Sequence, residues 1–527
     1  MEQLTEKDSL IEYGFTRALI TFTCILCALL EIVDTTIVNV ALNEMKGTLG
    51  ATLTDVAWVI TAYAIANVIV IPMTSWLSQQ FGRRNYFAAS IILFTVSSFL
   101  CGNATNIWEL VAFRFFQGMG GGALLVTAQT ILTETYPPEK RSMAQAIYGM
   151  GVIVGPTLGP PLGGYIVDNY SWPYIFYINV PLGILATIMT VSLVKSPRYG
   201  SKQSAKEVDW WGMLFLILFI GSLQFVLEHG QQDDWFEDNT ILILSVVSFL
   251  GFFFFIWREL IYDKPIVNLK VLKDKNLQVG TLMSFILGFG LFGSTFIIPL
   301  YTQSILGWTA TDAGLLLIPS SIMTGIMMPF IGKMIQAGVP QKYMVAVGLC
   351  IFFGFSFFMY GLITNDTGSE HMFWPLIIRG VGLGLLFVPV MTLSLSTLSG
   401  KAIGEGAAFT GMSRQLGGSF GIALITTFIS RDTQHHRVDL ISHIDPSHFE
   451  VQQRIAGMQA NFMSKGFSIN NSLSKAYQAI EGSVMKQATI LSYMDVFLYL
   501  GILFLVCVPF VLLIKQGKNK VDASNMH

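Results

Sequence analysis

Fourteen long apolar stretches divide the chain, and they constrain its fold more than any other feature. Each holds roughly the ~20 apolar residues that a helix needs to cross a bilayer, whereas strands of a membrane barrel alternate over about 10 residues. Of the 527 residues, 53% are hydrophobic and only 12% are charged, which is not the composition of a soluble domain. We therefore expect an all-α polytopic membrane protein. The stretches lie near residues 17–43, 53–77, 84–103, 107–133, 143–168, 172–194, 210–229, 240–260, 277–302, 312–336, 343–363, 372–397, 406–429 and 489–514.

The charged residues between these stretches predict the orientation of the chain. If the N-terminus is cytoplasmic, most of the 31 lysines and arginines fall on the cytoplasmic side, and the short outer loops contain only Lys46. Short cytoplasmic loops are enriched in positive residues, and long loops such as 430–488 are largely exempt from this rule. The sequence therefore predicts a multi-pass protein with both termini in the cytoplasm.

Two blocks of six stretches resemble each other, which indicates an internal duplication. The fourth stretch of each block places an arginine, Arg114 or Arg379, ahead of closely spaced glycines. The fifth stretches each contain two glycines four residues apart. Duplicated helical units are common in transporters. We expect an N-terminal six-helix bundle at 1–194, linkers and two extra helices at 195–276, a C-terminal six-helix bundle at 277–514 and a cytoplasmic tail at 515–527.

The outer loop 430–488 is the only sizeable soluble segment. Its apolar residues recur at helical spacing on both sides of Gly466, which predicts two amphipathic helices. They either pack on each other as a hairpin or form a docking surface for a partner. The loop also contains four histidines, but no carboxylate or cysteine spacing accompanies them, so solvated side chains are favoured and no metal site is predicted.

A stripe of small residues marks the fifth stretch. Four glycines recur every fourth residue, which forms a smooth groove on a helix, and the accompanying prolines remove backbone hydrogen bonds and bend it. We interpret this segment as a conformational hinge at a moving seam between two bundles, with a static packing helix as the alternative. The hinge residues are Gly151, Gly155, Pro156, Gly159, Pro160 and Gly163.

Charged residues inside predicted membrane helices are conspicuous, because each such charge costs about 2.5–3.5 kcal/mol. Glu31 and Asp34 are three residues apart and share a helix face, and Arg114 lies in the fourth stretch. We hypothesise that Asp34 and Arg114 face one internal cavity and that Asp34 carries a proton, with Glu31 as a second, coupled acid. Which acid is the main carrier stays open. The alternative is a static pair that fixes the first helix against the fourth.

Polar and aromatic residues on the expected pore-lining helices are candidates for substrate contact. An aromatic stripe on the ninth stretch suits broad apolar recognition, although core packing or lipid exposure is the ordinary role of any one aromatic. The candidate residues are Asn39, Trp58, Tyr63, Asn67, Gln117, Gln129, Met150, Phe285, Phe289, Phe292 and Arg414.

Several of these segments resemble motifs of one family. Residues 33–42 resemble the first-helix motif of the fourteen-span drug:proton antiporters of the major facilitator superfamily, and residues 114–118 resemble the fourth-helix motif whose arginine is associated with proton coupling. Residues 151–160 resemble the fifth-helix motif that marks antiporters. Segments 58–61, 136–142 and 163–166 are similar to the EmrB-like branch.

This resemblance implies two six-helix bundles that move about a central cavity, with two inserted helices. It implies proton-coupled export of hydrophobic or amphipathic toxic compounds across the bacterial inner membrane, without a cofactor. It also implies a membrane-fusion adaptor and an outer-membrane channel as partners, with 430–488 as the candidate adaptor contact.

The loop after the second stretch resembles the cytoplasmic gate of the superfamily in Gly82, Arg83 and Arg84. It departs from that pattern at Gln79, where an aspartate is expected, and at Ser75, where a glycine is expected. The usual carboxylate-based lock is therefore in doubt.

Two other functions are alternatives to drug export. An uptake symporter for a small nutrient fits the fifth-stretch pattern and the aromatic residues less well. An integral-membrane enzyme is less favoured, because no nucleophile–base arrangement is visible. The sequence contains no phosphate-binding P-loop motif, and nothing in it indicates a nucleic-acid partner.

Overall fold

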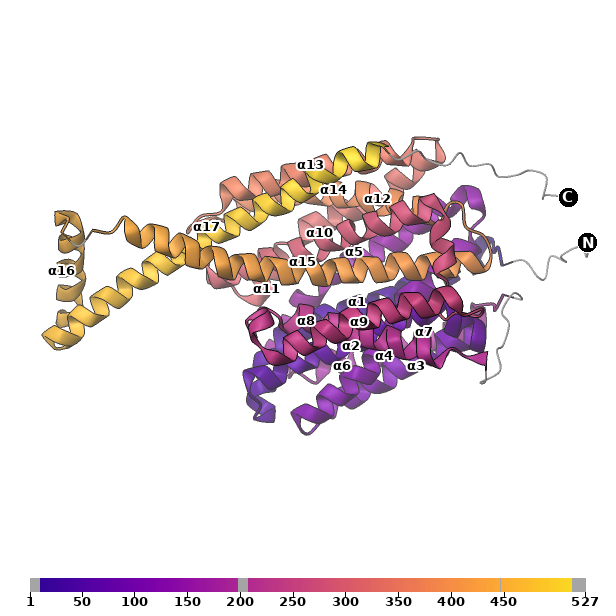
Figure 1. Cartoon of the computed structure of the whole chain (residues 1–527), viewed down its shortest axis with the longest axis horizontal. Coiled ribbons are helices and arrows are strands. Elements are labelled where there is room, and N and C mark those ends of the chain that lie inside the picture. Colours follow the sequence, from indigo (N-terminus) through magenta and orange to yellow (C-terminus); the bar gives the residue numbers. More distant parts are fainter. Residues whose placement is uncertain (1–9, 198–206, 446, 514–527) are drawn as a thin grey trace, which may run out of the picture.

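Long helices lying side by side form the body of the molecule, and two of them project from one end (Figure 1). The computed structural model describes residues 10–197, 207–445 and 447–513, and within these ranges it contains helices and no strand. The predicted tail at 515–527 lies outside the described residues. We call the end with the projecting helices the stalk end and the opposite end, where α1 and α10 begin, the base end.

The first six passes form the N-terminal bundle. The sixth is broken into two helices after a turn of aromatic residues. Capping residues fix the starts of the two helices that follow stalk-end turns. At the start of α2, Thr52 and Asp55 form a reciprocal capping box. At the start of α4, the Asn106 side chain accepts from the backbone N–H of Glu109. The elements are α1 (Gly14–Leu49), α2 (Leu53–Phe81), α3 (Arg83–Gly102), α4 (Ile107–Thr135), η2 (Pro138–Lys140), α5 (Arg141–Asn169), α6 (Tyr174–Tyr177) and α7 (Asn179–Leu193).

The remaining passes form the inserted pair and the C-terminal bundle. Thirteen helices of the described chain are long and apolar enough to cross a membrane. The predicted span at 406–429 is not among them, but it lies in α15, which runs beside α10 and α17 and completes the fourteen passes. The elements are α8 (Trp210–His229), η4 (Trp235–Glu237), α9 (Asn239–Ile261), η5 (Leu269–Lys273), α10 (Lys275–Ser304), α11 (Ala310–Leu315), α12 (Ile318–Gln336), α13 (Gln341–Leu362), α14 (Ser369–Leu395), α15 (Lys401–Ser442), α16 (Phe449–Ser464) and α17 (Ile469–Leu513).

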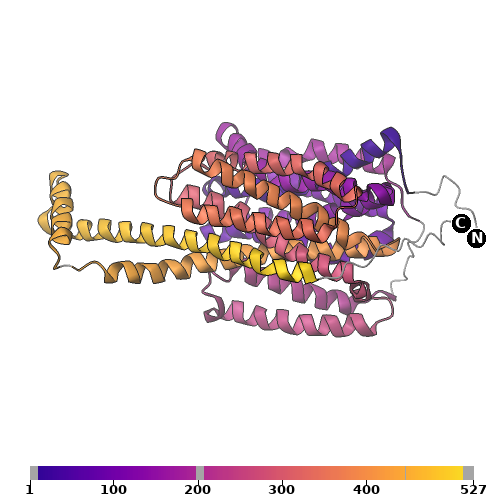
Figure 2. The ribbon, with the colours of Figure 1, turned by 90° about the horizontal axis from the view of Figure 1, so that it is seen from above.

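The predicted outer loop forms a helical stalk. Helices α15 and α17 extend beyond the bundles as an antiparallel pair, and α16 packs across the tip against α17 (Figures 1 and 2). The two predicted amphipathic helices lie in α16 and at the start of α17, and Gly466 between them has φ of +91°. The expectation of solvated histidines is wrong for His436, whose ring bonds the Asp495 carboxylate at 2.7 Å.

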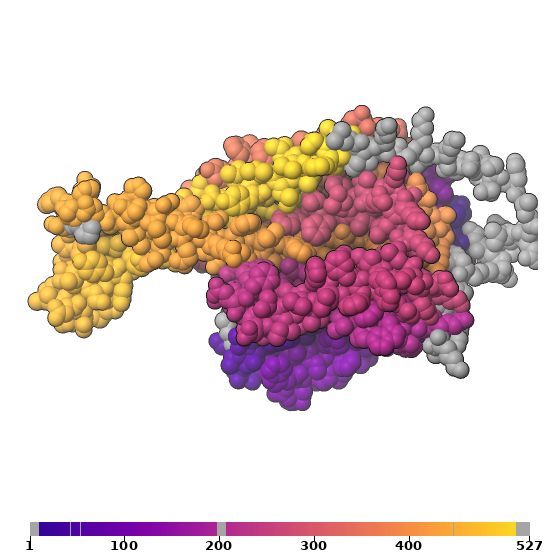
Figure 3. Space-filling view, in the orientation of Figure 1, coloured from indigo at the N-terminus to yellow at the C-terminus, as the bar shows by residue number. Residues whose placement is uncertain are grey.

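The inserted helix α8 bridges the two bundles, and α9 packs against α8. Figure 3 shows them lying across the boundary between the N-terminal bundle and α15. On the side of the N-terminal bundle, Thr61 bonds the His229 ring at 3.1 Å. On the side of the C-terminal bundle, the Gln224 amide donates to Ser419 at 3.0 Å. The insert therefore covers the seam where α2 meets α15.

Glycines allow the fifth helix of each bundle to pack closely on the first. Gly155 and Gly159 of α5 lie against Ile32 and Thr36 of α1. In the second bundle, Gly417 and Gly421 of α15 lie in the same way against Phe285 and Phe289 of α10. This correspondence supports the predicted duplication.

The expectation that the glycine stripe of α5 itself forms the seam between bundles needs correction. Gly151 and Gly163 also face α1, at Ile25 and Ile37, so all four glycines pack within one bundle. Other residues of α5 face the second bundle: Pro160 and Pro161 lie against Gly314 of α11, and Gly149 lies against Phe387 of α14. The glycines permit close packing inside the bundle, and the residues between them form the seam.

We predict that Gly159→Ala lowers the melting temperature of the purified protein. An added Cβ would collide with Thr36 and lie 3.1 Å from the Ile37 backbone nitrogen. Overpacking of this kind costs about 1–3 kcal/mol, which exceeds the ~1 kcal/mol that alanine gains over glycine in a helix. Gly354→Ala is the control, because an added Cβ there meets nothing within 4 Å, and it should leave the melting temperature unchanged or raise it. Equal stability of the two variants would contradict the close α1–α5 packing.

Candidate functional site

A buried ion pair joins the first helix to the fourth. Nη1 of Arg114 on α4 lies 2.5 Å from Oδ2 of Asp34 on α1, and the two side chains are 1% and 0% exposed. The guanidinium also donates through Nε to the backbone carbonyl of Val59 on α2 at 3.2 Å. The two charges that sequence reasoning singled out are therefore brought together.

Amide side chains complete the environment of Asp34. Gln117 on α4 and Asn179 on α7 each donate to Oδ1 at 2.8 Å. Both amides also donate to the Ser98 hydroxyl on α3, at 3.1 and 3.0 Å. Donors on α4 and α7 thus compensate the desolvation of the carboxylate on α1, without which a buried charge would be strongly unfavourable. Ser98 of α3 in turn holds the two amides.

This network is enclosed within the N-terminal bundle. Asp34 has no exposed surface in this conformation, and the side chains that donate hydrogen bonds to it come from α4 and α7 of the same bundle. Exchange of a proton at Asp34 therefore requires rearrangement of these side chains.

A second acid lies one helical turn away in a different setting. Oε1 of Glu31 accepts from the Asn67 amide of α2 at 2.9 Å, while Oε2 is buried without a hydrogen-bond partner among the described residues. Arg414 of α15 is close enough to interact electrostatically with Glu31. Arg414 is itself buried, with Nη1 3.5 Å from the Met391 sulfur and its guanidinium 5.6 Å from the Phe387 ring centre. Glu31 therefore lies where the two bundles meet.

Tyr63 connects the two acidic centres. The Arg114 guanidinium lies 4.0 Å from the centre of its ring, a distance at which cation–π attraction is strong. Its hydroxyl lies near Asn67, the partner of Glu31. Gly118 and Gly121 of α4 leave room for Tyr63, since a Cβ at either position would overlap it. The glycines that follow Arg114 in the sequence thus have a packing role.

The other residues predicted to contact substrate are dispersed. Asn39 is exposed on α1, and Trp58 packs against Phe225 and His229 of the inserted α8. Gln129 lies at the seam, where its amide donates to Gln145 at 3.2 Å and lies 3.3 Å from the Met391 sulfur. Met150 packs against the apolar core.

The predicted aromatic stripe on α10 lies largely in the interface with α15. Phe285, Phe289 and Phe292 each lie against a glycine of α15, and Phe285 also contacts Phe420 with ring centres 5.6 Å apart. This environment corresponds to the core-packing alternative.

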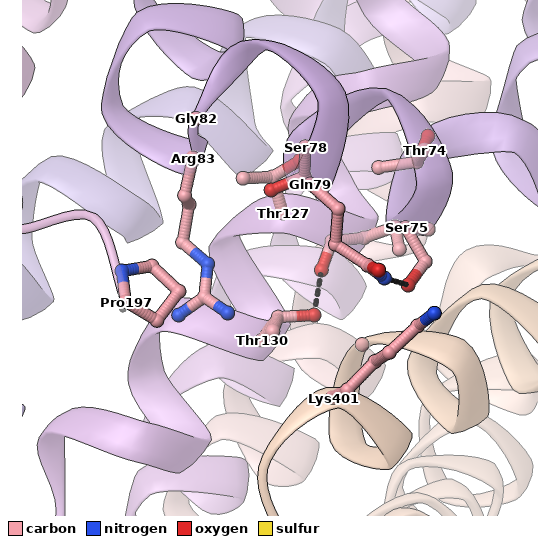
Figure 4. A pocket seen from close by; sticks show the side chains of 12 residues that line it. Thr74, Ser75, Ser78, Gln79, Gly82, Arg83, Thr127, Thr130, Pro197 and Lys401 are labelled. Atoms are coloured by element: carbon pink, nitrogen blue, oxygen red, sulfur yellow. Dashed lines mark hydrogen bonds between the residues drawn. The ribbon is translucent and has the colours of Figure 1, made fainter. Parts of the chain in front are cut away.

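Two of the predicted gate residues, Gly82 and Arg83, line a small pocket at the base end, where α2, α3, α4 and α15 meet (Figure 4). Gly82 has φ of +83° and separates α2 from α3. Arg83 points into the protein and pairs with Glu134 of α4, its Nη2 lying 3.0 Å from Oε1, while Arg84 is exposed. Gln79 bonds Ser75 at 3.2 Å.

Sequence reasoning missed Glu134, Ser98 and Asn179. Glu134 supplies the carboxylate that the loop lacks at Gln79, but it lies on another helix and 51 residues from Arg83. A single acid at the end of an apolar stretch was the only available signal. Ser98 and Asn179 carry no charge, so nothing in the sequence distinguishes them from other polar residues.

Arg379, the repeat counterpart of Arg114, has different hydrogen-bond partners. It is 2% exposed and donates to the hydroxyls of Ser294, Ser320 and Thr295 at 2.8, 2.9 and 2.6 Å. No acidic partner is recorded for it in the described part of the chain. The two halves thus share a buried arginine, and only the N-terminal half pairs it with an acid.

Known proteins share this sequence and architecture. The chain is 32% identical over 503 residues to the fatty acid resistance protein FarB of Neisseria gonorrhoeae, covering 95% of this chain and 97% of FarB. It is 32% identical over 507 residues to the multidrug export protein EmrB of Escherichia coli, covering 94% and 95%. It is 29% identical over 490 residues to the colistin resistance protein EmrB of Acinetobacter baumannii, covering 93% and 94%.

A solved structure shares the fold. The crystal structure of the human organic anion transporter MFSD10 superposes with a TM-score of 0.56 at 11% identity, covering 93% of this chain and 99% of that one. The sequence pattern of the Major Facilitator Superfamily matches residues 24–422, well over half of the chain. The chain therefore belongs to the Major Facilitator Superfamily and, through its relatives, to the EmrB-like branch of these transporters.

Proposed function

We propose that this protein exports hydrophobic or amphipathic toxic compounds in exchange for protons. The observation that carries the proposal is the pair of acids on α1: Asp34 is held by Arg114 inside one bundle, and Glu31 lies one turn away at the boundary with the other. The names of the relatives, which include fatty acid resistance and multidrug export, support the direction of transport and the substrate class.

The ion pair provides a way to couple a proton to movement. A proton on Asp34 removes the charge that holds Arg114, so the guanidinium is free to separate from α1. Arg114 also contacts α2 and Tyr63, so its displacement would be transmitted towards Asn67 and Glu31. One proton crossing ~100 mV supplies ~2.3 kcal/mol, which sustains a concentration ratio of roughly 40-fold.

The proposed cytoplasmic gate lies at the base end. We propose that Gly82, Arg83 and Arg84 act there with Glu134, since Arg83 and Glu134 are buried where α2 and α4 approach Gly404 of α15. Seam contacts also occur between Ser142 of α5 and the Gly332 carbonyl of α12, at 3.1 Å. Separation of the bundles at this end would have to part these surfaces.

We further propose a bacterial inner-membrane location with the base end in the cytoplasm and the stalk in the periplasm. The stalk tip exposes the apolar side chains of Phe449 (77%), at the start of α16, and Ile469 (63%), at the start of α17. A periplasmic adaptor that continues to an outer-membrane channel is the partner proposed for this tip. The proposal that the transporter works as part of a tripartite pump is supported by this exposed tip and by the resemblance to EmrB-like proteins.

The first test replaces the acids and the arginine of the coupling site. Asp34→Asn should abolish proton-driven efflux in vesicles while substrate still equilibrates, lowering the accumulation ratio by roughly 40-fold if one proton is lost per cycle. Glu31→Gln and Arg114→Ala, assayed in parallel, show which acid carries the proton. Asp366→Asn, which removes an exposed carboxylate far from the pair in sequence, is the control. Normal gradient-driven efflux by Asp34→Asn would refute the carrier role.

The second test concerns the base-end gate. Glu134→Gln removes the acidic partner of Arg83, and loss of one member of a buried pair costs about 3–5 kcal/mol. We expect a lower melting temperature and faster thiol labelling of a cysteine introduced by Ser75→Cys, with Cys350 replaced by serine. Arg83→Gln combined with Glu134→Gln should recover part of the stability. Strictly additive losses in this double-mutant cycle would show that the pair does not act as a unit.

The third test concerns the stalk. Phe449→Asp and Ile469→Asp should abolish drug resistance in whole cells and leave efflux by the purified protein in vesicles unchanged, because the stalk tip lies far from the coupling site. Gln453→Asp, which changes an exposed polar residue of α16, is the control. Loss of efflux in vesicles would instead place the defect in the transporter itself.

A further inference from the structure

A groove opens at the stalk end of the C-terminal bundle, away from the acids of α1. It lies where the turn after α10, the short helix α11, the start of α12 and the first turn of α14 meet. Its volume is about 710 Å³. Pockets that hold drug-sized molecules are typically about 300–1,000 Å³.

The walls of the groove are mainly apolar. Trp308, Leu315, Leu316 and Phe373 contribute to its surface. Leu315 and Phe373 are 47% and 42% exposed, so their side chains are open to an occupant. An aromatic and aliphatic lining of this kind binds the hydrophobic body of a small molecule.

Two carboxylates give the groove its charge. Asp312 lies in the first turn of α11 and Glu370 in the first turn of α14. Asp312 receives the Thr309 hydroxyl at 2.7 Å on Oδ2, which engages one of its two oxygens. Glu370 lies 3.4 Å from the ring of His371. None of the described residues that line the groove is basic. The groove is therefore complementary to a cation and disfavours an anion.

The groove adjoins the part of the fold that must move during transport. A Cβ at Gly314 of α11 would lie 2.7 Å from Cδ of Pro161 on α5, and Thr311 contacts Gly164 on the same helix. Thr157 of α5 and Ser321 of α12 are hydrogen-bonded a little deeper along this seam. An occupant of the groove would lie against helices that contact the kinked segment of α5.

The inserted helices cover one of the two seams between the bundles and not the other. Helices α8 and α9 lie over the seam between α2 and α15 (Figure 3). The groove lies instead beside the seam that α5 forms with α11 and α12. The inserted helices therefore do not separate the groove from the seam that α5 forms with α11 and α12.

We propose that this groove binds a drug-sized lipophilic cation at the stalk face of the transporter. The apolar walls hold the hydrophobic body, the Trp308 ring offers a cation–π surface, and Asp312 and Glu370 balance the charge. The proposal deepens the proposed function, on which it rests, by adding a second substrate site remote from Glu31 and Asp34.

Equilibrium binding of tetraphenylphosphonium to the purified full chain in a nonionic detergent tests this site. Asp312→Asn combined with Glu370→Gln should weaken binding about fivefold, since exposed charge pairs contribute up to ~1 kcal/mol. Binding of the neutral triphenylphosphine oxide should be unchanged. Asp366→Asn is the control, because Asp366 is an exposed carboxylate at the same end that does not line the groove. Unchanged tetraphenylphosphonium affinity in the double variant would overturn the proposal.

A second pair of variants controls for a folding defect, because the Asp312 carboxylate also accepts the hydroxyl of Thr309, the residue that caps α11. Leu315→Ala and Phe373→Ala remove apolar surface from the groove without touching the cap, and each should weaken binding of both probes. Photolabelling with an azido derivative of tetraphenylphosphonium should modify peptides that contain residues 308–319 or 369–373. Labels confined to α1, α2 or α15 would place the cation near Glu31 and refute the proposed groove site.

The groove and the proposed function fail separately. If Glu31→Gln abolishes tetraphenylphosphonium binding and the groove variants do not, the groove is refuted and proton-coupled export stands. If groove variants weaken binding but Asp34→Asn leaves gradient-driven efflux intact, the groove stands as a cation site and proton coupling at Asp34 falls.

Discussion

The ion pair between Asp34 and Arg114 is the interaction on which the organisation of the N-terminal bundle depends. Neither charge is tolerable alone in a membrane interior, and the amides of Gln117 and Asn179 satisfy the carboxylate oxygens that Arg114 leaves open. The pair therefore fixes the mutual positions of α1, α4 and α7. The contacts of Arg114, Gln117 and Asn179 all converge on this one carboxylate.

The two six-helix halves share a packing arrangement, but only the N-terminal half pairs its buried arginine with an acid among the described residues. The fifth helix of each bundle packs on the first through glycines, at Gly155 and Gly159 in one half and at Gly417 and Gly421 in the other. Both halves also retain a buried arginine. Arg379, however, is bonded by serine and threonine hydroxyls instead of a carboxylate. The C-terminal half therefore has no acid at the matching position in the described chain, and its repeat arginine has the environment of a structural group.

The inserted helices make the transporter asymmetric about its central seam. Helix α8 bonds both bundles, through Thr61 on one side and Ser419 on the other. Its residues Phe225 and His229 pack against Trp58, which sequence reasoning had assigned to substrate contact. An inserted helix that contacts both bundles restricts how they separate at the seam between α2 and α15.

The sequence alone determined the helical membrane fold and singled out Asp34 and Arg114 as charges inside apolar helices. These follow from local composition, because a bilayer requires long apolar helices and makes every internal charge conspicuous. Tertiary structure decided the partners. Glu134 meets Arg83 from another helix, Asn179 reaches Asp34 across 145 residues, and the glycine stripe of α5 faces α1 rather than the seam. Uncharged polar residues and the rotation of a helix about its axis leave no signal in a uniformly apolar segment, so only the packed structure shows which face meets which neighbour.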